Sequence, residues 1–524
     1  MRLVILLLPI CQLFVSAIPV VKYQNAKLIV GANYQLINQL FVESQTQCIC
    51  QCFANETCLT ATYIGTNQNC SLFSTKLNET DLQLATFEIN ASILSFINRT
   101  ISSTIRQAPN IQWLFDGNLN DSFGNYPGIS ANGNIQWISP DYSGNRKAAY
   151  FANKSYVIVP YTLELIDTSF TVSTWIRLLS NRPLNTSEFG IFTHCENIND
   201  NNCLYMSIRY GKLFFSLNNN NVIGNSFLTS NIWYHVAYVY DRITLTQSVY
   251  INGQLDGVLS STGIYQGNAS QIWIGASPFT YMYPNPFAYM DELNFVPRAE
   301  SADALLEEAT LVVYYKFDNS FFDSGPNKIY NSSGTNVRFD VNGRVNQALL
   351  INSNNSFFQS TSFYRLGQSN YPYSFSLWIY PLSMNGTIVQ LLSINNDWWS
   401  PMLGFDSSNH LVTQTWSGSV FYNVASNSFA MPLNVWTHVV ATFSTTNGLR
   451  LFINGTMVNS TSSSHSHGAS GTWNIMSIGA CTPMIWCSNA ETRIVANQFR
   501  GKIDEMRVYS RELTNMEIQA FATI

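Results

Sequence analysis

The chain contains one stretch twice: Trp113-Leu-Phe-Asp-Gly-Asn-Leu-Asn-Asp-Ser-Phe-Gly-Asn125 and Tyr315-Lys-Phe-Asp-Asn-Ser-Phe-Phe-Asp-Ser-Gly-Pro-Asn327. Four later landmarks recur in the same order: Ser173–Ile176 with Ser376–Ile379, Asn231–Val236 with Asn434–Val439, Tyr250–Gly253 with Phe452–Gly455, and Asp291-Glu292 with Asp504-Glu505. This period is far longer than the roughly 20–50 residues of a solenoid unit. The repeat is therefore a whole domain, and the sequence predicts a tandem pair.

Each copy consists mainly of short runs in which apolar and polar residues alternate, separated by turn residues. Phe170–Ile176 and Trp233–Tyr240 alternate in the manner of half-buried strands. Asn252-Gly253 and Asn454-Gly455 separate two such runs, and both residues of a type I′ hairpin turn need a positive φ. Because helical periodicity is almost absent, the sequence predicts a mainly β protein containing two antiparallel β-sandwiches of about 200 residues each.

One helix is expected at the end of each copy. Apolar residues have helical spacing from Ser301 to Ala309 and from Thr514 to Phe521. Thr514 followed by Glu517 is a capping-box pattern, in which each residue satisfies a backbone amide near the helix start.

Composition excludes several classes of function. The 524 residues are enough for about three domains. Charged residues make up 11% of the chain and the net charge is −5, with Lys and Arg scattered along it. No basic patch of the kind that binds nucleic acid is present.

The N-terminus predicts export. Arg2 precedes the apolar run Leu3–Phe14, and Val15-Ser-Ala17 supplies a small-residue cleavage site, so residues 1–17 are expected to form a signal peptide. The run is shorter than the roughly 18–20 residues that span a bilayer, and no transmembrane segment is expected later. The mature protein is expected to be secreted and extracellular.

Glycosylation sequons are frequent, as in secreted glycoproteins. A chain rich in Asn, Ser and Thr also produces them by chance. The candidate sites are Asn55, Asn78, Asn98, Asn153, Asn185, Asn268, Asn331 and Asn385.

Cysteines cluster near the N-terminus. Five of them lie between Cys48 and Cys70, which predicts a small domain held together by disulfides whose connectivity cannot be deduced from spacing. Each repeat carries one further pair, Cys195 with Cys203 and Cys481 with Cys487. Between the cysteine-rich head and the first repeat, residues 101–112 are polar, include a proline and predict a linker.

The head resembles the PAN/apple family over residues 18–100. The resemblance rests on Cys48-Ile-Cys-Gln-Cys52, Cys58, Ala61-Thr-Tyr63 and Cys70-Ser-Leu-Phe73. It implies a disulfide-stabilised α+β domain with the nested pairs Cys48–Cys70 and Cys52–Cys58. Cys50 departs from that pattern: it could pair with another chain, remain a free thiol, or alter the assignment.

Each repeat resembles the laminin G-like domains of the concanavalin A-like lectin/glucanase superfamily, which implies two antiparallel β-sandwich jelly rolls in tandem. The matching elements begin with Phe115-Asp116 and Phe317-Asp318 and end with Asp291-Glu292 and Asp504-Glu505. The resemblance places the first domain at residues 113–309 and the second at residues 310–524. It also implies that some relatives hold calcium near the loops of the sandwich.

Four aspartates are candidate Ca²⁺ ligands. Asp121 and Asp323 follow the first strand of each copy, whereas Asp291 and Asp504 open the last strand. The first and last strands of a jelly roll are neighbours, so each pair could supply hard oxygen ligands. The alternative is that these side chains cap turns by accepting backbone hydrogen bonds.

Aromatic residues outside the strands are candidate ligand contacts, because sugar rings stack on aromatic faces. These candidates are Tyr281, Tyr283, Trp398, Trp399 and Trp486. The alternative is that their loops fold back and bury the rings. The tryptophans within the strands, Trp175, Trp233, Trp378 and Trp436, are instead expected in the core between the sheets.

The sequence favours a non-enzymatic recognition or adhesion protein that binds glycans or matrix and cell-surface proteins. A secreted glycoside hydrolase is an alternative, since the concanavalin A-like superfamily that the repeats resemble also includes glucanases. Such an enzyme needs two carboxylates flanking the bond. Asp291-Glu292 and Asp504-Glu505 are adjacent, so on regular strands they point to opposite faces. The other alternative is a purely structural matrix component.

Overall fold

The computed structural model places the chain in two compact units, residues 1–107 and 108–524. In the first unit it describes the strands and Ser44, Gln47, Cys48, Gln51, Cys52, Cys58 and Gln68. In the second it describes all residues except 145, 153, 182, 196–198, 200, 261, 277–285, 330, 396–397, 428–430, 462–464 and 482–491.

The described residues of the first unit include antiparallel strands and two disulfides. Its five-stranded sheet has the order β1-β7-β4-β5-β3, and β2 pairs with β6. Cys48 bonds to Cys70 and Cys52 bonds to Cys58, the pairing implied by the PAN/apple resemblance. Cys50 lies outside the described residues. The strands are β1 (Val20–Gln24), β2 (Ala26–Val30), β3 (Leu36–Phe41), β4 (Thr60–Ile64), β5 (Asn69–Phe73), β6 (Leu82–Thr86) and β7 (Ala91–Phe96).

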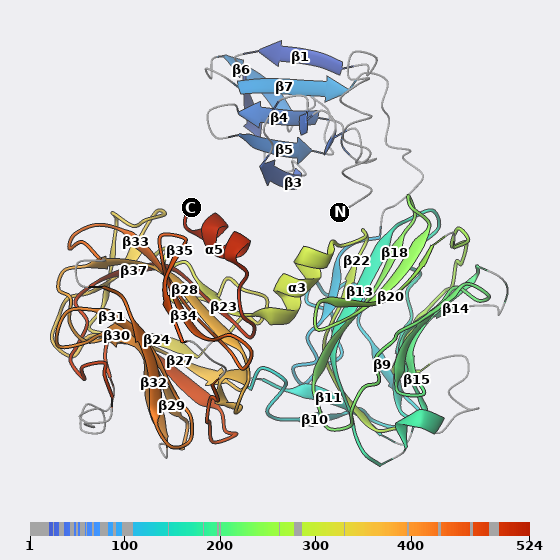
Figure 1. The fold of residues 1–524 in the computed structure, drawn as a ribbon. Helices are drawn as coiled ribbons and strands as arrows, with labels where there is room; N and C mark the ends of the chain where they lie inside the picture. Colours follow the sequence, from blue (N-terminus) through green and yellow to red (C-terminus); the bar gives the residue numbers. More distant parts are fainter. Residues whose placement is uncertain are drawn as a thin grey trace. The chain divides into compact units, whose positions relative to one another are not determined.

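The second unit holds two β-sandwiches, which confirms the predicted fold class (Figure 1). We call residues 108–310 the first sandwich and residues 311–524 the second sandwich. In the first, one sheet has the order β10-β11-β22-β13-β18-β19-β20, with β8 also paired to β22. The facing sheet has the order β17-β16-β15-β14-β21-β12-β9.

The elements of the first sandwich are β8 (Ile111–Trp113), β9 (Ile129–Ala131), β10 (Gln136–Ile138), β11 (Ala148–Phe151), β12 (Tyr156–Val159), β13 (Phe170–Leu178), β14 (Glu188–Cys195), β15 (Cys203–Arg209), β16 (Lys212–Ser216), β17 (Asn221–Ile223), β18 (Tyr234–Asp241), β19 (Thr246–Ile251), β20 (Gln254–Ser260), β21 (Ile272–Ile274), β22 (Ala288–Val296) and helix α3 (Ala302–Thr310). Residues 108–112 belong to the first sandwich rather than to the expected linker, because Ala108 is part of the core and β8 begins at Ile111. Residues 101–107 lie outside the described residues.

The second sandwich repeats this plan with the sheet orders β25-β26-β37-β28-β33-β34-β35 and β24-β27-β36-β29-β30-β31-β32, and β23 pairs with β37. Its elements are β23 (Leu311–Tyr315), β24 (Ser332–Thr335), β25 (Arg338–Asp340), β26 (Ala348–Ile351), β27 (Phe357–Phe363), β28 (Tyr373–Pro381), β29 (Thr387–Ser393), β30 (Trp399–Phe405), β31 (Leu411–Trp416), β32 (Phe421–Ala425), β33 (Thr437–Ser444), β34 (Gly448–Ile453), β35 (Thr456–Ser460), β36 (Asn474–Ile478), β37 (Gly501–Tyr509) and helix α5 (Asn515–Phe521).

Local sequence signals account for the hairpins and the helices. Asn252 and Gly253 have φ values of 50° and 77° and connect β19 to β20. The Ser301 side chain caps α3 by accepting from Ala304 N. Thr514 and Glu517 form the predicted capping box at the start of α5. Both helices therefore begin where the sequence indicates.

The strand tryptophans do not lie in the core between the sheets, which corrects that expectation. In β13 the alternation directs Phe170, Val172 and Ile176 into the core, so Trp175 belongs to the opposite, outer face of the sheet. Trp378 is likewise absent from the core of the second sandwich and lies beneath the Arg344 guanidinium at 4.1 Å. Trp233 and Trp436 are half-buried. The phase of the alternation, rather than side-chain size, decides the face.

A β-bulge places both members of each acidic couple on the outer face, so the expectation of opposite faces is wrong. Ser173 pairs with Asn294 and Trp175 with Asp291, which leaves one extra residue in β22. Glu292 supplies it in the left-handed conformation, with φ 45°. Met290 and Leu293 on either side both point into the core, and Glu505 repeats the arrangement with φ 50°. The bulge shifts the alternation by one residue.

The two sandwiches join without a linker. Helix α3 ends at Thr310 and β23 begins at Leu311, and Ser510 N donates to Thr310 O at 2.8 Å. Arg365 of the second sandwich lies 4.4 Å from the Trp175 ring of the first. It also donates to Ala309 O at 3.2 Å. We call these contacts, together with those of Tyr142 and Arg146 described below, the junction.

Candidate functional site

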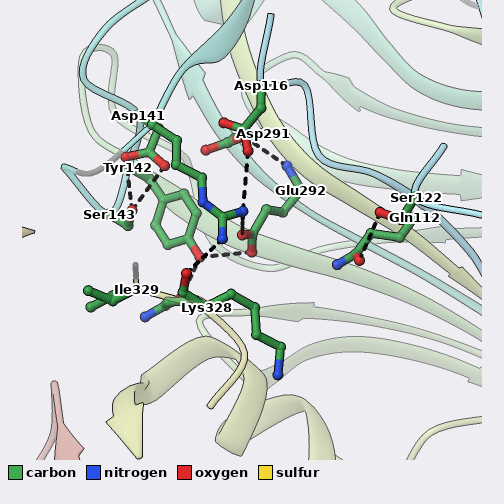
Figure 2. Close-up of polar contacts among 12 residues, drawn as sticks. Gln112, Asp116, Ser122, Asp141, Tyr142, Ser143, Asp291, Glu292, Lys328 and Ile329 are labelled. Carbon is green, nitrogen blue, oxygen red and sulfur yellow. Dashed lines mark hydrogen bonds and ion pairs between the residues drawn. The ribbon is translucent and has the colours of Figure 1, made fainter. Parts of the chain in front are cut away.

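Four carboxylates gather on the outer face of the first sandwich beside the junction (Figure 2). Asp291 and Glu292 come from the bulge of β22, Asp116 follows β8, and Asp141 lies between β10 and β11. Burial raises the pKa of Asp291 well above its usual value, and the neighbouring Asp141, Glu292 and Asp116 raise it further. Burial likewise raises the pKa of Glu292, to about 8.

Arg146 is the cation in contact with this acidic cluster. Its Nη1 donates to Asp116 Oδ2 at 3.2 Å and lies 3.9 Å from Glu292 Oε1. Its Nη2 donates to the backbone oxygen of Lys328, in the second sandwich, at 2.7 Å. The Arg146 guanidinium therefore contacts two carboxylates of the first sandwich and one backbone carbonyl of the second.

The acidic couples are buried beneath other groups. Asp291 is 1% exposed and Glu292 is 7% exposed, and the Tyr142 hydroxyl lies 2.9 Å from Glu292 Oε2. The Tyr142 ring stacks on Trp175 with centroids 4.2 Å apart. Asp504 and Glu505 in the second sandwich are buried as well. A glycosidic bond would need open access to both carboxylates, which neither couple provides.

Asp121 and Asp323 act as turn caps. Asp121 accepts hydrogen bonds from Phe123 N at 3.0 Å and Tyr126 N at 2.6 Å. Asp323 accepts from the backbone amides of Tyr314, Gly325 and Ile329. These oxygens satisfy backbone donors in the manner of Asx turns. Over the described ranges, no group of three or more His, Cys, Asp or Glu residues is arranged to hold a metal ion, and calcium binding stays a prediction.

An open groove of 320 Å³ lies on the first sandwich between α3 and the segment around β8. Its lining includes Gln112, Phe123, Asn294, Glu300, Ala304 and Glu308. The Phe123 ring is 62% exposed. This groove was not predicted, because its members lie far apart in sequence and none carries a recognisable motif.

Hydrogen bonds fix the polar side chains of this groove. Ser122 Oγ donates to Gln112 Oε1 at 3.2 Å (Figure 2). Asn294 Nδ2 donates to Glu308 Oε1 at 2.9 Å, and Ser173 Oγ donates to the same oxygen at 2.8 Å. Polar groups held in this way are preorganised for a ligand.

A second recess, of 370 Å³, lies in the second sandwich and has a different character. Its lining includes Asn447, Arg450, Met457 and Thr461, and Arg450 is paired with Glu512 at 3.2 Å. No aromatic side chain lines it. The two copies therefore present different candidate surfaces.

The predicted aromatic contacts fall into two groups. Trp398 packs against the core of the second sandwich, as the fold-back alternative expected, and Trp399 is half-buried at the start of β30. Tyr281, Tyr283 and Trp486 lie outside the described residues, as do Asn55, Asn78, Asn98 and Asn153. The sequon residues Asn185, Asn268, Asn331 and Asn385 are exposed.

The disulfides of the sandwiches are partly described. Cys195 bonds to Cys203. Cys481 is disulfide-bonded, while Cys487 lies outside the described residues, so that pairing stays a prediction.

The buried histidines have structural environments. His194 Nδ1 lies 2.8 Å from Tyr265 Oη, and burial lowers the His194 pKa to about 4. His438 Nε2 lies 3.0 Å from Ser376 Oγ. Burial and the nearby Arg507 and Arg344 lower the His438 pKa to about 3.

The profile of the concanavalin A-like lectin/glucanases superfamily matches residues 151–305 and 352–519. The chain belongs to this superfamily. The laminin G-like domain of this superfamily therefore occurs twice in the chain. The profile of the PAN domain matches residues 19–94. Among curated proteins none matches the chain.

The chain is also similar to solved structures at low identity. Domain 4 of AbnA, a GH43 extracellular arabinanase from Geobacillus stearothermophilus in complex with arabinotriose, is 21% identical, with 40% of this chain and 98% of that chain covered and a TM-score of 0.28. Domains LG4-5 of the mouse laminin alpha1 chain are 13% identical, with 73% and 96% covered and a TM-score of 0.24. A botulinum neurotoxin type C structure, concerned with ganglioside-dependent cell entry, is 13% identical, with 76% and 97% covered and a TM-score of 0.34. At these TM-scores the overlays carry no argument about function.

Proposed function

We propose that the protein is a secreted, non-enzymatic recognition protein that binds glycans through the open groove of the first sandwich. The observation that carries the proposal is the groove itself, which joins the exposed ring of Phe123 to fixed amide and carboxylate side chains. Amides donate and accept, and carboxylates accept, so together they match the hydroxyl groups of a sugar. The apolar face of a sugar ring packs on the aromatic side chain.

Burial of the acidic couples argues against the hydrolase alternative. Asp291 and Glu292 lie under Tyr142 and the junction, and Glu505 binds Arg507 at 2.9 Å. Glycoside hydrolysis by acid–base chemistry uses two carboxylates that reach the bond from opposite sides. We therefore infer binding without turnover.

Export is the second part of the proposal. The two cysteine pairs of the head and Cys195–Cys203 form disulfides, which persist in oxidising compartments outside the cytosol. No helix within the described part of the chain is long and apolar enough to cross a membrane.

A glycan array probed with the full chain tests the proposal. Binding is expected, and Phe123→Ala is expected to weaken it about tenfold, the equivalent of about 1.4 kcal/mol. Phe322→Ala is the matched control, because Phe322 is 48% exposed near the same turn of the second sandwich and does not line the groove. Binding with unchanged affinity in Phe123→Ala would refute the groove as the site.

Three further outcomes point elsewhere. Silence on glycans together with binding to an extracellular protein would favour the protein-ligand alternative. Release of sugar would revive the hydrolase. Loss of binding with EDTA would restore a role for Ca²⁺, with ligands other than the capped Asp121 and Asp323.

A further inference from the structure

The Tyr142 hydroxyl bridges the two sandwiches by contacting two acceptor oxygens at once. Glu292 Oε2, in the first sandwich, lies 2.9 Å away. Asn327 Oδ1, in the second sandwich, is its other hydrogen-bond partner. All three side chains are buried. A phenol has one proton, so it can donate to only one of these two atoms.

The orientation of the Asn327 amide is fixed by its other end. Asn327 Nδ2 donates to Val312 O at 2.7 Å and lies 3.4 Å from Leu311 O. Both partners are backbone carbonyls and can only accept. A flipped amide would set its oxygen against two carbonyl oxygens. Asn327 Oδ1 therefore faces Tyr142 and needs the phenol proton.

Donor counting then assigns a proton to Glu292. If Tyr142 donates to Asn327, its oxygen can only accept from Glu292, and a carboxyl group donates only when it is protonated. The described contacts thus form a chain that runs from the Glu292 carboxylic acid to Tyr142 and on to Asn327. The alternative, with Glu292 ionised, leaves the Asn327 oxygen facing the lone pairs of the phenol.

The charges around Glu292 favour the protonated form. Asp141 and Glu308 face it with negative charge, and Asp116 and Asp291 belong to the same cluster. Arg146 is the cation beside it, 3.9 Å away, and its closer contact is with Asp116. The segment of the second sandwich packed here contributes Asn327 and the Lys328 carbonyl, both uncharged.

The second sandwich contains the same bulge, but its glutamate has different hydrogen-bond partners. The Tyr314 hydroxyl donates to Glu505 Oε2, and Arg507 Nη2 donates to that oxygen at 2.9 Å. Tyr314 Oη makes no second acceptor contact in the described structure comparable to the one with Asn327. This carboxylate oxygen accepts from two donors, and no described contact of Glu505 requires a carboxyl proton, so Glu505 serves as an internal comparison.

We propose that Glu292, Tyr142 and Asn327 form a proton-operated clasp that holds the two sandwiches together while Glu292 is protonated. When Glu292 loses its proton, the carboxylate takes the phenol hydrogen bond and Asn327 loses its donor. The new charge also lies in a cluster with three other carboxylates, and the Arg146 guanidinium beside it is closer to Asp116. Rising pH therefore loosens the junction.

Proton linkage fixes the direction of the effect. The pKa of Glu292 is raised to about 8 in the folded protein from 4.5 in the unfolded chain. The folded state then holds a proton that the unfolded state has released, so this contribution to stability falls as pH rises between those values. It is complete below about pH 4.5 and lost above about pH 8.

Glu292→Gln in the full chain is the central test. A glutamine amide donates to Tyr142 as the carboxylic acid does, but it does not titrate. The thermal midpoint of the second unit is measured from about pH 6 to about pH 9 for both proteins. Wild type is expected to fall relative to Glu292→Gln by about 2–5 °C over this range. Parallel profiles would refute the clasp.

Glu505→Gln is the matched control. It removes a carboxylate that accepts from Arg507 and Tyr314 and that helps to raise the pKa of Asp504, so it is expected to lower the midpoint while the fall attributed to Glu292 persists. Asp504, whose pKa burial raises to about 7, adds its own slope to wild type and to both variants. The difference between wild type and Glu292→Gln therefore reports the titration of Glu292 together with the effect of its charge on Asp291, whose pKa that charge raises.

Two measurements remain decisive if Glu292→Gln does not fold. The infrared spectrum of wild type minus Tyr142→Phe at pH 6 is expected to show a carboxylic acid C=O stretch that is perturbed by loss of the phenol and absent above pH 9. Hydrogen exchange of residues 326–329, corrected for intrinsic rates, is expected to accelerate at least threefold in wild type between pH 6 and pH 9. An ionised Glu292 at pH 6, or pH-independent exchange, would overturn the proposal.

Discussion

At the scale of single residues, burial and hydrogen-bond partners separate structural groups from candidate functional ones. Asp121 and Asp323 use their oxygens on backbone amides, whereas Phe123 projects into solvent beside a groove. Residue types alone ranked them the other way: aspartates suggested a ligand site and Phe123 suggested nothing. A short polar side chain after a strand is ambiguous until its partners are known, because capping and metal binding use the same oxygens.

His438 makes the protein sensitive to acid. Its folded-state pKa of about 3 lies below its unfolded value of 6.5, so only the unfolded state binds this proton between those values, and stability falls as pH drops through that range. His438→Gln is expected to remove about 2–3 kcal/mol of the loss between pH 6.5 and pH 4.5. Urea unfolding at both pH values measures it, and equal losses in variant and wild type would contradict the prediction.

At the scale of elements, signals that act within a few residues were predictive. Asn252-Gly253 and Asn454-Gly455 became hairpin turns with positive φ, and α5 acquired its capping box. The bulges at Glu292 and Glu505 were missed, since an extra residue is defined by the partner strand rather than by its own neighbours. The extra residue in each bulge explains why both carboxylates of each acidic couple lie on the same face of the sheet instead of on opposite faces.

The two hairpin glycines offer a matched pair. Gly253 and Gly455 have φ values of 77° and 78°, so an alanine is strained to the same degree at either position. A Cβ at Gly253 would lie 2.4 Å from the backbone Cα of Leu306 in α3, but one at Gly455 would lie 3.3 Å from the Ala522 side chain. Gly253→Ala is therefore expected to cost about 1–3 kcal/mol more than Gly455→Ala.

Chemical denaturation of the two glycine variants measures this difference. Equal losses of unfolding free energy would show that α3 moves away from the hairpin at no cost. That result would contradict the close packing of α3 on the turn.

At the scale of the whole molecule, the duplicated sandwich and the PAN domain could be predicted, but the junction could not. The repeated landmarks are separated by a whole domain, so they specify two similar units. Contacts such as Arg365 with Trp175, or Tyr142 with Asn327, join non-equivalent surfaces of the two copies. No internal repeat encodes them, and the groove beside α3 likewise depends on tertiary packing.

The junction is expected to make the sandwiches unfold together. Arg365→Ala removes the contact with Trp175 and the hydrogen bonds to Ala309 O and Ser510 Oγ. The calorimetric transition is then expected to broaden or split, with the van 't Hoff enthalpy falling below the calorimetric enthalpy. Arg209→Ala, which removes an ion pair to Glu188 inside the first sandwich, is expected to lower the midpoint and keep a single transition.

The direct passage from Thr310 at the end of α3 to Leu311 at the start of β23 has a consequence for multivalent capture. Tandem domains joined by a flexible linker sample many distances between their binding sites, so they tolerate targets whose ligands are spaced differently. Domains that are joined directly hold their binding sites at one distance. If each sandwich binds a ligand, the gain in affinity from binding two ligands at once will depend sharply on the spacing of those ligands along the target. Synthetic scaffolds that differ only in that spacing should then show a narrow optimum instead of a plateau.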